Sequence, residues 1–167
     1  MSLSILGTPA WLVGVALGLA MLIAGPATAQ NAQPSRSGEW VTRCDDSQID
    51  PRQKMCVLVQ TLTMNNQPNV HFVVIVVKNA VLRVVAPLGV LLPQGVAVKI
   101  DGEDFGGMPF ARCLQNGCVA EMDIDDRLLR KLKAGKGANF VIYGQPDQPV
   151  NVPVSLSGFT RGYDTLP

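Results

Sequence analysis

The sequence predicts an all-β protein: an antiparallel β-sandwich with one short amphipathic helix, disulfide-stapled between neighbouring strands. Three observations predict this class. Short runs rich in Val, Ile, Leu and Thr alternate with breaks that contain Gly, Pro or Asn. Residues 125–134 have helical periodicity, and the four cysteines fall into two pairs that are close in sequence.

The runs divide into nine candidate strands, which is typical of a sandwich or barrel. They are residues 40–44, 55–63, 70–77, 81–86, 96–100, 109–113, 118–122, 139–143 and 150–156. The run 70–77 has Val70, Phe72, Val74 and Val76 on one face and Val73, Ile75 and Val77 on the other. Because both faces are apolar, we expect both to be covered, by the helix or by a second copy of the chain.

The helix is predicted from Asp125, which is a good N-cap, to Gly135, which stands where a C-cap belongs. Leu128, Leu129 and Leu132 lie on one side of it. Basic residues gather near its C-terminal end, namely Arg130, Lys131, Lys133 and Lys136. Such a cluster is typical of a solvated helix face, and the alternative is a patch for anionic lipid or polysaccharide head groups.

Residues 1–29 are predicted to be a secretory signal peptide. An apolar run from Trp11 to Ala24 is followed by the small residues at 27–29, before Gln30. The run is shorter than the roughly 20 apolar residues of a membrane span, so we expect no stable membrane span after cleavage. This predicts a periplasmic or secreted protein of the cell envelope.

The remaining sequence is predicted to form a flexible arm over residues 30–38 and a single domain over 39–167. The formal net charge of the chain is +1. A protein that binds nucleic acid is normally far more basic, so nucleic acid is not an expected partner.

The even number of cysteines predicts a disulfide framework, for which three connectivities exist. Local pairing is favoured, because Cys113 and Cys118 bracket the short loop "LQNG". Cys44 and Cys56 would then close the connection between the first two strands. A redox or metal role is less favoured, since the chain has no Cys-x-x-Cys pair and a single histidine.

Candidate catalytic and metal-binding residues are sparse. His71 lies in the most apolar strand, which predicts a buried, hydrogen-bonded residue rather than a catalytic base. Asp101, Glu103 and Asp104 share one loop, where an Asp-Gly hairpin turn is favoured over a calcium site. We therefore predict no catalytic residue, no cofactor, no metal and no enzymatic activity.

Four features in this order are specific when taken together. They are Trp40 followed by Cys44 and Cys56, "PLGVLLPQGVAVKIDG" at 87–102, "PFARCLQNGCVAEMDI" at 109–124, and "PVSLSGFTRGYDTL" near the end. On these features the chain resembles the invasion-associated locus B proteins of the bacterial envelope. The resemblance implies an exported β-sandwich with two local disulfides and a family name derived from the invasion of host cells. It implies no catalytic site.

Two functional hypotheses follow. The first is a non-enzymatic binding or structural protein that contacts an unknown envelope or host protein or a surface glycan. Its contact loops would be 101–107, 114–118 and 145–150, and the strand that begins at Val70 and ends at Val77 is a candidate for a homodimer contact. The second is a small periplasmic enzyme or small-molecule binder with a cleft near His71. It requires an exposed His71 within hydrogen-bond reach of a carboxylate.

Overall fold

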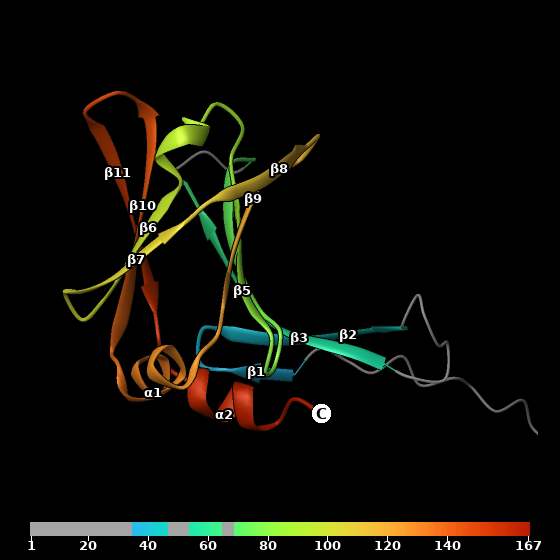
Figure 1. Cartoon of the computed structure of the whole chain (residues 1–167). Coiled ribbons are helices and arrows are strands. Elements are labelled where there is room, and N and C mark those ends of the chain that lie inside the picture. The colour runs from blue at the N-terminus through green and yellow to red at the C-terminus, as the bar shows by residue number, and fades with distance from the viewer. Residues whose placement is uncertain (1–34, 47–53, 65–68) are drawn as a thin grey trace, which may run out of the picture. The chain divides into compact units, whose positions relative to one another are not determined.

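The larger of two antiparallel sheets has seven strands, in the order β1-β2-β3-β4-β5-β9-β8 (Figure 1). The structure is a computed structural model that describes residues 35–46, 54–64 and 69–167. The strands of this sheet are β1 (Ser35–Ser37), β2 (Trp40–Asp46), β3 (Lys54–Thr63), β4 (His71–Val76), β5 (Val81–Ala86), β8 (Phe110–Leu114) and β9 (Gly117–Asp123).

The smaller sheet has four strands, in the order β11-β10-β6-β7. They are β6 (Val96–Ile100), β7 (Glu103–Met108), β10 (Gly137–Gln145) and β11 (Gln148–Ser155). The chain changes sheet after β5, after β7 and after β9. A short 3-10 helix η1 (Leu92–Gln94) precedes β6, helix α1 (Asp126–Ala134) precedes β10, and helix α2 (Phe159–Asp164) follows β11.

The core lies between the two sheets. Alternate residues of β4, namely Phe72, Val74 and Val76, are buried there. Val98 of β6 and Phe140 of β10 are buried from the other side, and the rings of Phe72 and Phe140 lie 5.6 Å apart. Side chains from both sheets therefore share one core. The predicted antiparallel β-sandwich is confirmed.

Both disulfides join residues that face each other on adjacent antiparallel strands. Cys44 of β2 is bonded to Cys56 of β3, and Cys113 of β8 is bonded to Cys118 of β9. These are the two local pairs that the sequence favoured, and no cysteine is free. Closing loops of this length stabilises a fold by about 2–3 kcal/mol for each bond in the chain-entropy model.

Four elements depart from the prediction: β1, β7, η1 and α2. The flexible arm is wrong for residues 35–37, which pair with β2, while residues 30–34 and the predicted signal peptide lie outside the described residues. The expectation of a single helix is also wrong, because the six residues of α2 form a second one. Neither β7 nor α2 has a clear local pattern, and each depends on a neighbouring element.

Helix α1 begins and ends as predicted. The Asp125 side chain accepts a hydrogen bond from the backbone N–H of Leu128 at 2.7 Å, and Gly135 is the C-cap. Leu128 and Leu132 are buried in the core between the sheets. The helix therefore does not cover the outer face of β4, so this one of the two expected covers is wrong, and the other, a second copy of the chain, stays a prediction. In the described part of the chain, no helix is long and apolar enough to span a membrane.

Candidate functional site

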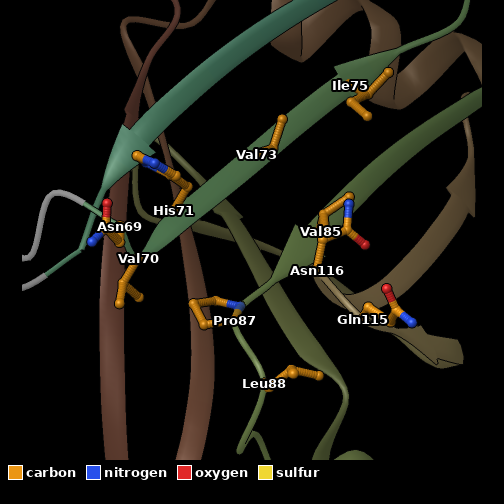
Figure 2. A pocket seen from close by; sticks show the side chains of 10 residues that line it. All are labelled: Asn69, Val70, His71, Val73, Ile75, Val85, Pro87, Leu88, Gln115 and Asn116. Carbon is orange, nitrogen blue, oxygen red and sulfur yellow. The ribbon is translucent and has the colours of Figure 1, made fainter.

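A pocket of about 640 Å³ lies on the outer face of the seven-stranded sheet, near the beginning of β4 and the end of β5 (Figure 2). Val73 and Ile75 of β4 and Val85 of β5 line its apolar part. Val73 and Val85 are directly opposed in the sheet register, so their side chains lie on the same face. Because the alternating residues of β4 fill the core, these three side chains are left half-buried on the outside.

The wall of the pocket comes from segments that are far apart in the sequence. Pro87 and Leu88 follow β5, and Gln115 and Asn116 form the tip of the β8–β9 hairpin. Asn69 lies just before β4, and with Gln115 and Asn116 it gives the pocket three carboxamide side chains. Figure 2 shows Gln115 and Asn116 on the opposite side of the pocket from Asn69. The pocket thus combines aliphatic and uncharged polar groups.

His71 lines this pocket and is exposed, so the prediction of a buried histidine is wrong. The physical reason is the register of the sheet: His71 has the same parity along β4 as Val73 and Ile75, which face outward. The second functional hypothesis also required a carboxylate beside His71. The ten residues that line the pocket include no Asp or Glu.

Gly117 allows the hairpin tip to reach the pocket. It has a φ of +146°, and a Cβ atom there would lie 2.5 Å from the carbonyl oxygen of Ala86 and 2.8 Å from Cγ1 of Val85. Both distances are too short for a real contact, so only glycine lets β9 begin this close to the end of β5. Gln115 and Asn116 are held beside Val85 as a result.

We expect Gly117→Ala to lower the free energy of unfolding by about 1–3 kcal/mol, through overpacking against Ala86 and Val85. Urea unfolding followed by circular dichroism measures the loss. Gly106→Ala is the matched control, because Gly106 has a φ of +93° and no atom within 4 Å of the position that a Cβ atom would take. Equal losses in the two variants would show that the hairpin tip is not held by close packing.

The predicted hairpin turn is confirmed at Asp101 and Gly102, and the remaining residues of the acidic segment 101–107 belong to strand β7. Asp101 and Gly102 have φ values of +48° and +87° and separate the paired residues Ile100 and Glu103, which is type I′ geometry. The backbone N–H groups of Gly137 and Lys136 donate to the Asp101 carboxylate at 3.0 and 3.1 Å, and these bonds lower the pKa of Asp101 below its usual value.

Glu103 has partners on helix α1. It accepts hydrogen bonds from Lys131 and Arg127, and these two cations lower the pKa of Glu103. Asp104 accepts the backbone N–H of Gly106 at 2.7 Å. The carboxylates of this loop therefore bind groups of the protein itself. Among the described residues, no group of three or more His, Cys, Asp or Glu side chains is placed to hold a metal ion.

The basic residues of α1 are also largely paired. Besides the contacts with Glu103, Lys133 forms an ion pair of 2.6 Å with Asp164 at the end of α2. Pairing of this kind agrees with the solvated helix face that the sequence favoured. It leaves less uncompensated positive charge for anionic head groups.

Strand β4 is the fourth of the seven strands and is paired with β3 on one side and β5 on the other. A homodimer cannot form by adding a strand to β4, because both of its edges are occupied. Only the outward side chains, such as Val73 and Ile75, are available for a contact with a second copy.

The family model described as invasion associated locus B (IalB) protein matches residues 40–167. The chain belongs to the IalB family. Invasion protein B homologues from Brucella abortus strain 2308 and from biovar 1 strain 9-941 are each 33% identical to it over 81 residues. That match covers 48% of this chain and 47% of each relative, so it spans about half the length of the relatives.

The crystal structure of invasion associated protein b from Bartonella henselae is similar to this IalB-family chain, with a TM-score of 0.64. The two share 20% sequence identity, and the superposition covers 78% of this chain and 93% of the other. At this identity the likeness shows a common fold. The described residues therefore have the same fold as the Bartonella henselae protein.

The first and the last of the four segments that resemble the IalB family meet in the core. Trp40 is 1% exposed, and its Nε1–H donates to the carbonyl oxygen of Ser155 at 2.9 Å. The buried amide of Gln60 donates to the same oxygen at 3.1 Å. The ring of Trp40 packs edge-on against Phe159 at 5.2 Å, and Phe159 stacks on Tyr163. Trp40, Phe159 and Tyr163 therefore build the fold, whereas the two middle segments contribute Pro87, Leu88, Gln115 and Asn116 to the pocket lining.

Sequence reasoning identified part of the pocket in this IalB-family chain. The loop 114–118 was expected to make contacts, and its residues Gln115 and Asn116 line the pocket. The loops 101–107 and 145–150 belong to hairpins of the smaller sheet and do not line it. The contribution of Pro87 and Leu88 was missed. The sequence feature that could have indicated the pocket is the apolar outer face of the strand 70–77, because an apolar surface of this kind is normally shielded from water.

Proposed function

We propose that this IalB-family chain is an exported, non-enzymatic protein of the bacterial envelope that binds a partner in the pocket beside His71. The observation that carries the proposal is the pocket itself, in which aliphatic side chains and convergent polar groups lie together on the outer face of the sheet. A largely apolar depression with a few polar groups is the usual form of a binding site.

Two features support export. The sequence begins with the pattern of a secretory signal peptide. All four cysteines of the chain are joined in disulfides, which form and persist in oxidising compartments such as the periplasm. Contact with host cells is part of the proposal because the relatives in Brucella and Bartonella carry invasion in their names.

The chemistry of the pocket supports binding over catalysis. Its lining has one imidazole, and it lacks the hydroxyl, thiol or carboxylate with which that imidazole would form a nucleophile or a proton relay. A small enzyme centred on His71 is therefore the less supported candidate. The three carboxamides are suited to hydrogen bonding with a ligand rather than to proton transfer.

Expression of the full chain in a Gram-negative host tests the proposed export and the two disulfides together. The periplasmic protein is labelled with a thiol reagent, and its intact mass is measured by mass spectrometry before and after reduction. Its disulfide bridges are then mapped by proteolysis. We expect a chain that begins at Gln30, carries no free thiol, and contains the bridges Cys44–Cys56 and Cys113–Cys118. A retained N-terminus or a reactive thiol would contradict the proposal.

A further inference from the structure

We infer that the occupant of the pocket is an extended peptide segment of a partner protein, which inserts one aliphatic side chain between β4, β5 and the β8–β9 hairpin tip. The inference rests on the proposed binding function and specifies its ligand. Three properties of the lining carry it: the shape and type of its apolar part, the chemistry of its polar rim, and its lack of acidic or strongly basic groups.

The apolar part of the pocket selects an aliphatic group. Val73, Ile75 and Val85 present branched side chains, and no Phe, Tyr or Trp lines the pocket. A sugar ring would therefore find no large aromatic side chain to stack on. A branched aliphatic side chain can instead contact these three residues and exclude water from them.

The polar rim matches a peptide backbone. Asn69, Gln115 and Asn116 each present a carbonyl acceptor and an NH2 donor. A peptide group likewise offers one N–H donor and one C=O acceptor. Carboxamides on both sides of an aliphatic floor can therefore hydrogen-bond the backbone on either side of an inserted side chain. An acyl chain would leave these polar groups without partners.

The charge of the lining argues against a charged ligand. The lining contains no Asp, Glu, Lys or Arg, so a phosphate or ammonium head group would lose its water without gaining an opposite charge. Two exposed leucines add apolar surface: Leu88, in the pocket wall, is 58% exposed, and Leu114, next to Gln115, is 50% exposed. They provide contacts for apolar residues of the same segment.

Nuclear magnetic resonance of the tag-free mature protein tests the inference, because His71 is the only histidine of the chain and its imidazole signals have a single origin. The first probe is the neutral peptide acetyl-Gly-Ser-Leu-Ser-Gly-amide. The second, acetyl-Gly-Ser-Ser-Ser-Gly-amide, has the same backbone without the aliphatic side chain. We expect the leucine peptide to shift the His71 signals saturably and to bind at least about tenfold more tightly than the serine peptide.

Two pairs of variants test whether the leucine peptide binds in the pocket. Val73→Asp places a charge in the apolar part and should abolish binding of the leucine peptide, whereas Val57→Asp alters the same outer face outside the pocket and should not. Asn116→Ala removes one rim carboxamide and should weaken binding about two- to tenfold. Asn151→Ala, on the exposed edge strand β11, should leave binding unchanged.

Maltotriose and phosphatidylcholine vesicles complete the set of probes. If either shifts the His71 signals and the leucine peptide does not, the peptide inference is overturned while the proposed binding pocket stands. If no probe shifts them, both the inference and the proposed binding function fail. Equal binding of the two peptides, or unchanged binding to the Val73→Asp variant, would also overturn the inference.

Discussion

Replacing Trp40 by alanine is expected to lower the free energy of unfolding by about 3–5 kcal/mol, the range for a large aromatic side chain in a core. Trp40 is 1% exposed and packs against Phe159, so its removal leaves a cavity where β2 meets α2. It also removes the indole donor to the Ser155 carbonyl, which then keeps only the Gln60 amide as its side-chain partner. Urea unfolding followed by circular dichroism measures the loss.

Trp40→Phe is the control for this prediction. It keeps an aromatic ring in contact with Phe159 and loses the indole N–H, so we expect a smaller loss of about 1–2 kcal/mol. Because alanine removes both the ring and the donor, its loss must exceed that of phenylalanine. A Trp40→Ala variant as stable as the Trp40→Phe variant would show that the contact with α2 does not hold the C-terminal segment in place.

Gly158→Ala is expected to destabilise the protein by about 2–5 kcal/mol, the sum of left-handed backbone strain and overpacking. Gly158 precedes α2 with a φ of +85°, and a Cβ atom there would lie 2.1 Å from the carbonyl oxygen of Ser37 and 2.8 Å from the amide nitrogen of Gly38. These atoms are backbone atoms of the β1–β2 turn and cannot rotate away. Either the turn or the helix has to move.

Gly89→Ala separates the two contributions, and thermal unfolding of both variants measures them. Gly89 has a similar φ of +94°, but no atom lies within 4 Å of the position where its Cβ would be. This variant therefore acquires the backbone strain alone, about 1–2 kcal/mol. If Gly158→Ala lowers the stability no more than Gly89→Ala does, the close approach of α2 to the β1–β2 turn is not a stabilising feature of the fold.

Much of the fold could be predicted because the sequence patterns that indicate its elements involve residues close together in the chain. Alternation of branched residues located the strands, the spacing of the cysteines indicated the two bridges, and Asp125 and Gly135 marked the ends of α1. Helix α2 gave no such signal, because "FTRGYD" is short and contains a glycine. Gly162 is needed for packing: a Cβ atom there would lie 2.5 Å from Cδ1 of Leu58 on β3.

Strand β7 and residue His71 show why the remaining errors arose. The sequence "EDFGGM" has two adjacent glycines and no alternation, yet it is a strand because the Asp101-Gly102 turn brings it back along β6. His71 was expected inside because its neighbours are apolar. Local hydrophobicity does not distinguish the two faces of a strand whose outer face is also apolar.

The sequence by itself determined the fold class, the family and the ends of α1 and favoured the disulfide pairing, because each depends on residues that are close in the chain or on a recognisable order of segments. The tertiary structure decided the pocket. Its lining combines the beginning of β4, the end of β5 and a hairpin tip more than forty residues further along the chain than His71. Only the pairing β4-β5-β9-β8 and the close approach at Gly117 bring those segments together, and neither can be read from local pattern.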